Sequence, residues 1–170
     1  VVITAFREFH AKHPEALLIF AWGNQWPAIM PTVARSTFVE GTPEIGAGGV
    51  ISIGPWLQAN GLPGTSYVDL GMPANRAMPG VLASADVALF PNRCDPGTNV
   101  VAMEAMATGV LSILAANTGQ LDIVDASHSF PLTRQFPVEP YPPYAGTDGW
   151  AEPDVGEALQ LLEAVFSGRE

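Results

Sequence analysis

The chain has few positive charges and almost no cysteine. Only 7 of its 170 residues are Lys or Arg, against 17 Asp or Glu, which gives a net charge of −10. This balance argues against binding nucleic acid or anionic lipid through bulk charge. The single cysteine excludes an internal disulfide framework and fits a reducing compartment. Apolar runs such as residues 16–22 are far shorter than the roughly 20 residues of a membrane span, so none is expected.

Apolar residues make up 48% of the chain, within the usual globular share of about 45–50%, so most of it is expected to fold. At roughly 150 residues per domain, the length predicts one domain, or one domain of a longer protein. Val2, Phe6 and Phe9 fall on one helical face at the very start, and no initiator Met precedes them. We therefore expect the chain to be a piece of a longer protein.

Short apolar runs alternate with helical patterns along the chain. Strands are predicted at residues 16–21, 66–70, 86–90 and 110–115. Helices are predicted at residues 1–13, 56–60, 75–84, 99–108 and 155–166, with a helical turn at 121–125. Residues 130–144 carry five prolines and are predicted to be an irregular surface segment. The alternation predicts an α/β fold with one open, mostly parallel sheet and helices on both faces.

The loop after the 86–90 strand is the most informative segment, because ligands of open α/β sheets bind beyond the carboxyl ends of strands. Asn99 is a good helix N-cap, Gly97 permits close approach of a ligand, and the helix N-terminus that follows favours an anion. Arg93 could add a positive charge. Glu104 lies about 7.5 Å further along the axis, roughly a diphosphate-to-ribose separation, where it could accept from both ribose hydroxyls. The alternative, a capped crossover helix with an exposed glutamate, is favoured by composition alone.

Residues 85–124 resemble the donor-site segment of retaining glycosyltransferases of the two-domain GT-B fold, family four (the "group one" glycosyl transferases). The resemblance is carried by the runs ADV (85–87), EAMATG (104–109) and ANTG (116–119). More loosely, it extends over the whole chain. It implies that residues 1–170 form the Rossmann-like, C-terminal half of such an enzyme, which binds the nucleotide sugar.

The resemblance also implies roles for individual residues. Glu104 matches the family's ribose-binding glutamate, and Asp95 approximately matches the acid that contacts the donor sugar. Asp95 stands nine positions before Glu104, where the family usually has eight. Arg93 is the only basic residue in the loop. The turn that faces sugar and diphosphate comprises Gly97, Thr98 and Asn99. The turn that closes the pocket comprises Asn117, Thr118 and Gly119.

The implied function is retaining transfer of a sugar from a UDP- or GDP-linked donor to a glycan or lipid-linked acceptor, as in polysaccharide biosynthesis. The enzyme would be cytoplasmic or peripheral to the inner face of the membrane, and would require no cofactor. The family's first strand, basic diphosphate-binding loop and N-terminal acceptor domain would precede Val1. This fragment alone is therefore expected to be inactive, and its catalytic residues are unknown. The alternative is a non-catalytic α/β module that docks a partner through residues 130–144.

Two remaining groups of reactive side chains carry weaker signals. His10 and His13 are three residues apart, but two histidines alone do not make a metal site, and no metal is expected. Cys94 lies beside Arg93, which could favour its thiolate. Without a Cys–His pair in the pattern, Cys94 is interpreted as lining the donor pocket.

Overall fold

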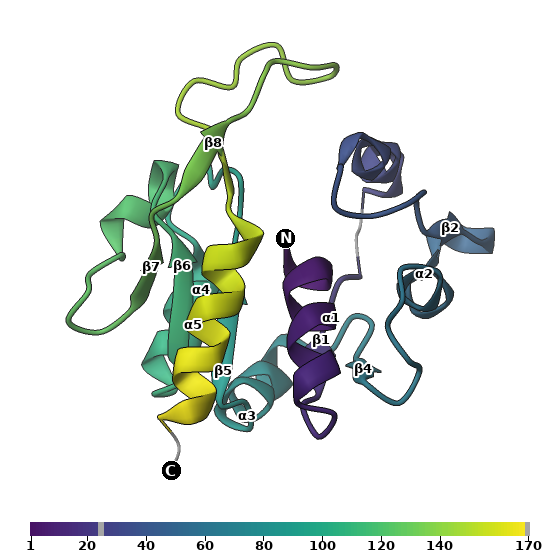
Figure 1. Cartoon of the computed structure of the whole chain (residues 1–170). Coiled ribbons are helices and arrows are strands. Elements are labelled where there is room, and N and C mark those ends of the chain that lie inside the picture. Colours follow the sequence, from purple (N-terminus) through teal and green to yellow (C-terminus); the bar gives the residue numbers. More distant parts are fainter. Residues whose placement is uncertain (24–25, 169–170) are drawn as a thin grey trace. The chain divides into compact units, whose positions relative to one another are not determined.

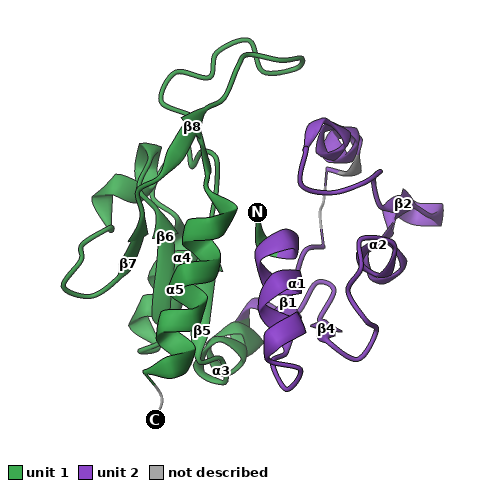
Figure 2. Ribbon diagram, viewed as in Figure 1, with its two compact units in different colours: residues 1–2, 76–170 green, residues 3–75 purple. Residues whose placement is uncertain are grey.

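The computed structural model of the chain describes residues 1–23 and 26–168, which form two compact units. One unit comprises residues 3–75, and the other comprises residues 1–2 and 76–170 (Figure 2). Together they contain helices, small parallel sheets and two short antiparallel pairs (Figure 1). The predicted α/β class is confirmed at this level. Within the described residues, no helix is long and apolar enough to cross a membrane.

The unit of residues 3–75 is built around a parallel pair of strands. Its elements are α1 (Val2–Lys12), β1 (Leu18–Phe20), η1 (Pro27–Arg35), β2 (Glu44–Ile45), η2 (Ala47–Gly49), β3 (Ile51–Ser52), α2 (Ile53–Ala59) and β4 (Tyr67–Asp69). Strand β1 pairs with β4 in parallel, and β2 pairs with β3 in antiparallel fashion. Helix α2 ends before Gly61, whose φ of +86° suits a glycine. Leu57 and Leu62 on either side of this end are buried.

The unit of residues 76–170 is built around a three-stranded parallel sheet in the order β5-β6-β7. Its elements are η3 (Asn75–Ala77), α3 (Met78–Ala83), β5 (Val87–Phe90), α4 (Val100–Ala107), β6 (Leu111–Ala115), η4 (Thr118–Asp122), β7 (Phe130–Leu132), β8 (Gln135–Pro137), β9 (Ala151–Pro153) and α5 (Val155–Ser167). Strands β8 and β9 form an antiparallel pair. The core of this unit includes the central strand β6, in which four of five residues are buried.

Local sequence signals explain the ends of the two long helices in this unit. The Asn99 side chain caps α4 by accepting from the Ala102 N–H at 3.1 Å, and Gly109 follows the helix with a φ of +83°. Asp154 caps α5 by accepting from the Glu157 N–H at 2.8 Å. The buried face of α5 comprises Ala158, Leu162 and Val165.

The predicted strands and helices form close to the expected positions, with three corrections. The four predicted strands all form and pair in parallel, but in two sheets rather than one, because β1 pairs only with β4, and β5 only with β6, among the described residues. Residues 130–144 are not wholly irregular, since they contain β7 and β8. Pro131 and Pro137 are tolerated there because each lies in a strand with only one paired neighbour. The turn predicted at 121–125 begins earlier, at Thr118.

Candidate functional site

The loop of residues 91–99 joins the carboxyl end of β5 to the N-terminus of α4. Helix geometry leaves the first N–H groups of α4, those of Val100 and Val101, without an acceptor inside the helix. Together with the helix dipole, these groups form an electropositive end that attracts anions. The predicted strand, loop and capped helix are therefore present at this place.

The turn after β6 is joined to this loop by two hydrogen bonds. The Gly119 N–H donates to the Asp95 carbonyl at 3.1 Å, and the Asp95 N–H donates to the Thr118 Oγ1 at 2.8 Å. Gly119 also approaches Gly97 so closely that a Cβ on Gly119 would overlap the Gly97 carbonyl. Thr118 adopts a left-handed φ of 40°, which is unusual for a residue other than glycine. Two segments more than 20 residues apart thus form one rigid arrangement.

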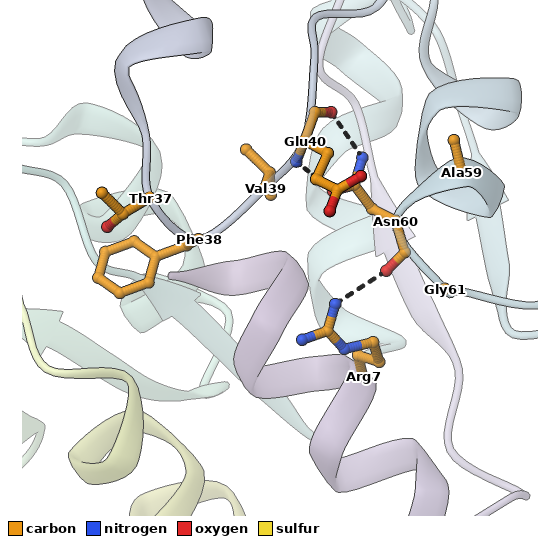
Figure 3. Close-up of a pocket in the computed structure, with 8 residues that line it drawn as sticks. All are labelled: Arg7, Thr37, Phe38, Val39, Glu40, Ala59, Asn60 and Gly61. Carbon is orange, nitrogen blue, oxygen red and sulfur yellow. Dashed lines mark hydrogen bonds between the residues drawn. The ribbon is translucent and has the colours of Figure 1, made fainter.

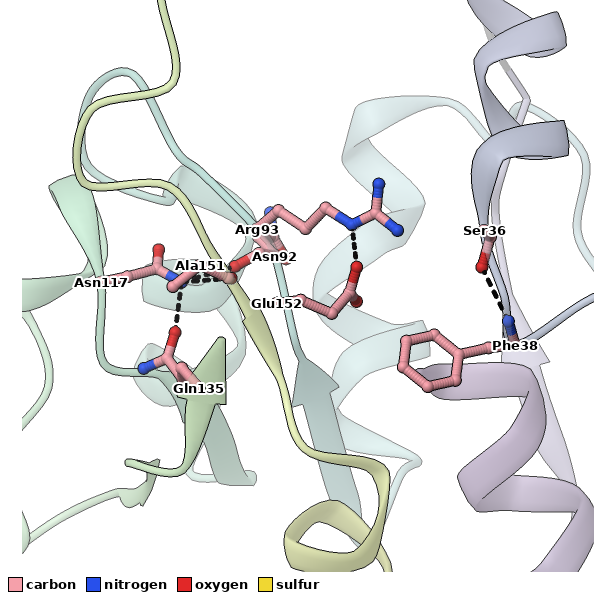
Figure 4. A network of polar contacts seen from close by, with 8 residues as sticks. All are labelled: Ser36, Phe38, Asn92, Arg93, Asn117, Gln135, Ala151 and Glu152. Atoms are coloured by element: carbon pink, nitrogen blue, oxygen red, sulfur yellow. Dashed lines mark hydrogen bonds and ion pairs between the residues drawn. The ribbon is translucent and has the colours of Figure 1, made fainter. Parts of the chain in front are cut away.

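Asn117 links the same loop to the β8–β9 hairpin (Figure 4). Its Nδ2 lies 3.0 Å from the Asn92 carbonyl, 2.7 Å from the Gln135 Oε1 and 3.2 Å from the Ala151 carbonyl. Asn117 is 5% exposed, so these acceptors are shielded from water. Asn117 was predicted to close the pocket. In the structure its side chain holds together the 91–99 loop, β8 and β9.

Arg93 is not a free cation. Its guanidinium forms an ion pair with the Glu152 carboxylate, and its carbonyl accepts from the Ala151 N–H at 2.9 Å (Figure 4). The side chains of Arg93 and Glu152 are 30% and 16% exposed, so water screens the pair only in part. An anion bound by Arg93 would therefore have to compete with Glu152 or share the guanidinium with it.

The remaining predicted residues occupy less constrained positions. The Asp95 carboxylate accepts from the Gly97 N–H at 3.4 Å, a weak contact that leaves most of its capacity available. The Thr98 hydroxyl donates to the Asp122 carboxylate at 3.2 Å. Glu104 is half-buried on α4, between the fully buried Ala102 and Ala105. Among the described residues, no group donates to or pairs with the Glu104 carboxylate.

The surroundings of Cys94 disfavour its thiolate. Burial raises the pKa of the Cys94 thiol, a hydrogen bond with Thr118 lowers it, and the Asp95 carboxylate raises it. The Arg93 guanidinium pairs with Glu152 and is not among the groups that shift the pKa of Cys94. Cys94 is a poor candidate nucleophile. In the part of the chain that the structure describes, no cluster of three metal-ligating side chains occurs.

Gln120 is a residue that the sequence analysis missed. It is fully buried, and its Oε1 accepts from the Asn99 Nδ2 at 3.4 Å. Its Nε2 has no hydrogen-bond partner among the described residues. A buried amide beside the N-cap of α4 therefore helps to orient Asn99. Polar residues surround Gln120 in the sequence (Asn117, Thr118 and Asp122), so no local pattern indicates that it is buried.

Two cavities lie outside this loop. One, of about 440 Å³, is in the unit of residues 3–75 (Figure 3). There the Arg7 Nη1 donates to the Asn60 carbonyl at 3.0 Å, and the Glu40 N–H donates to the Asn60 Oδ1 at 2.7 Å. The second, of about 480 Å³, is bounded by the β8–β9 hairpin and the segment that joins its strands. It shares Gln135 and Ala151 with the network around Asn117.

No protein-family model matches the chain, and a search of curated proteins found no relative. The resemblance to glycosyltransferases therefore depends on the residues quoted for it. The structure adds that the loop of residues 91–99 and the turn of residues 117–119, which lie within the segment that bears this resemblance, contact one another at one end of a parallel sheet.

Proposed function

We propose that this chain is the nucleotide-sugar-binding part of a retaining glycosyltransferase of the GT-B type. The observation that carries the proposal is the contact between the 91–99 loop and the 117–119 turn at the N-terminus of α4. Together they form a preorganised backbone surface with free N–H groups at the carboxyl end of β5. Anionic groups such as a diphosphate are the ligands that such a surface favours.

In this proposal each predicted residue has a physical role. The N-terminus of α4 and the Gly97–Thr98 backbone would bind the diphosphate, which needs stabilisation as it becomes the leaving group. Glu104, half-buried and without a partner among the described residues, would accept from two ribose hydroxyls. Asp95 would accept from hydroxyls of the donor sugar. The protein contributes binding and orientation, and no metal or cofactor is invoked.

The proposed function assigns to this chain only part of a glycosyltransferase site. In the family that the chain resembles, most acceptor contacts and the main cations for the diphosphate belong to other segments than those described above, so the chain alone should bind the donor without transferring sugar. Arg93 would be a secondary cation because Glu152 already neutralises it. We place the complete enzyme in the cytoplasm, or at the inner face of the membrane, where nucleotide sugars are used for glycan or lipid-linked acceptors.

Isothermal titration of UDP and GDP into the 170-residue chain tests the proposal. One of the two should bind saturably. Glu104→Gln keeps the shape and one acceptor oxygen but loses the charge, and should lose affinity by about 1.5 kcal/mol, the low end of the range for hydrogen bonds to charged groups. Glu104→Ala should lose more.

The matched control is Glu8→Ala, which removes an exposed helix glutamate from the other unit. It should leave the affinity unchanged. If Glu104 is only a surface residue, both Glu104 substitutions will leave nucleotide affinity unchanged, and stability will move by less than about 0.5 kcal/mol. Absence of binding by the unmodified chain would favour the non-catalytic module.

A further inference from the structure

The cavity at the β8–β9 hairpin has a chemical character of its own. It measures about 480 Å³, within the range of about 300–1,000 Å³ found for small-molecule sites. Its apolar wall includes Trp150, Pro137, Val138 and Pro140, and its polar groups come from Gln135, Thr147 and Asp148. Among the described residues, no basic side chain lines it. This combination does not suit an anion.

The walls of this cavity are held by hydrogen bonds within the segment that joins β8 to β9. The Thr147 hydroxyl donates to the Val138 carbonyl at 2.6 Å, the Trp150 N–H donates to the Thr147 carbonyl at 2.9 Å, and the Val138 N–H donates to the Trp150 carbonyl at 3.2 Å. The Trp150 ring also contacts the Tyr144 ring, with centroids 5.2 Å apart. A ligand would therefore meet a largely preformed surface.

The cavity is coupled to the candidate donor site through shared residues. Gln135, which lines the cavity, accepts from the Asn117 Nδ2 at 2.7 Å, and the carbonyl of Ala151 accepts from the same nitrogen. A Cβ on Gly149, in the cavity wall, would lie 3.7 Å from the Thr118 methyl group. Cavity and donor-site turn are thus neighbours in one unit, and they share hydrogen-bonded side chains.

We infer that this cavity binds a neutral pyranose unit of the glycan acceptor, an inference that rests on the proposed function. A pyranose has an apolar face of C–H groups, which suits Trp150 and the prolines. It also has hydroxyl groups on its rim, which can donate to the Asp148 carboxylate. Asp148 is exposed, and it is the one titratable side chain of the described residues that lines the cavity. An organic cation is the competing ligand, since it too would prefer an aromatic ring and a carboxylate.

The test is a titration of the 170-residue chain with four saccharides in turn: methyl α-glucopyranoside, maltotriose, cellotriose and chitotriose. Binding is monitored through the NMR signal of the Trp150 indole N–H. At least one saccharide should shift this signal saturably at millimolar concentration. Asp148→Ala should weaken that binding at least about tenfold, because hydrogen bonds to a charged acceptor are lost. The matched control is Glu139→Ala, which removes an exposed carboxylate of the same segment that does not line the cavity. It should leave the binding unchanged.

Several outcomes would overturn the inference. These are no shift with any of the saccharides up to about 10 mM, equal weakening by Glu139→Ala, or a shift of the Trp150 signal by choline but by none of the saccharides. A UDP-sugar that shifts Trp150 when UDP does not would assign the cavity to the donor sugar instead. The proposed function can fail separately. If saccharides bind through Asp148 while no nucleotide binds, the cavity is a saccharide site and the donor site is wrong.

Discussion

Substitution of Gly119 by alanine tests whether the donor-site turn and loop form one rigid arrangement. The new Cβ would overlap the Gly97 carbonyl and would lie 2.9 Å from the Asp95 carbonyl. Both neighbours are backbone atoms, so no flexible side chain can move aside. Either the loop or the turn must shift, and the hydrogen bond from the Gly119 N–H to Asp95, 3.1 Å in the native protein, would be strained or broken.

The cost can be estimated from these two effects. Overpacking at a tightly packed position costs about 1–3 kcal/mol, and loss of one ordinary hydrogen bond costs about 0.5–1.5 kcal/mol. We therefore expect Gly119→Ala to lower the free energy of unfolding by about 1.5–4.5 kcal/mol. With a urea dependence of about 1–3 kcal/mol per molar, the unfolding midpoint should fall by about 0.5 M or more.

Urea unfolding followed by circular dichroism measures this change, and Gly97→Ala is the matched control. Gly97 lies on the other side of the same contact, but a Cβ there would meet no heavy atom of the described residues within 4 Å, and its φ is not left-handed. The control should stay within about 0.5 kcal/mol of the native protein. Equal midpoints for Gly119→Ala and the native chain would refute the packing of the turn against the loop.

Three further variants or reactions probe the same unit. Because burial raises the pKa of the Cys94 thiol, iodoacetamide should alkylate it more slowly than free cysteine at about pH 8, and equal or faster reaction would contradict its environment. Asn99→Ala removes the cap of α4 and should cost about 1–2 kcal/mol in thermal or urea unfolding, whereas no change would mean that the cap is not formed. Asn117→Ala leaves buried acceptors unpaired and should cost about 1–3 kcal/mol, and a neutral result would contradict the network.

The elements governed by local signals could be predicted from the sequence. The capped helix α4 and the apolar strands β5 and β6 lie where Asn99, Gly109 and the apolar runs indicate. Each of these signals acts within a few residues of the feature that it determines. The same is true of α1, which ends shortly before Pro14.

Features that depend on distant partners could not be predicted. Strand β8 has only three residues, which is too short for an apolar pattern to reveal it. It forms because it pairs with β9, with Gln135 opposite Pro153, across a proline-rich segment. The ion pair between Arg93 and Glu152 joins residues 59 positions apart. Arg93 was predicted to offer a positive charge to a ligand, but Glu152 neutralises it. The close contact of Gly119 with Gly97 likewise becomes visible only when two loops meet.

The measurement that tests the central claim most directly is amide NMR of the 170-residue chain titrated with UDP and with GDP. The donor-site account predicts saturable shifts, for one nucleotide at least, concentrated at residues 95–104 and 117–119, with smaller effects elsewhere. Shifts that cluster around Arg7 and Asn60, or the absence of shifts with both nucleotides, would contradict a donor site at the N-terminus of α4.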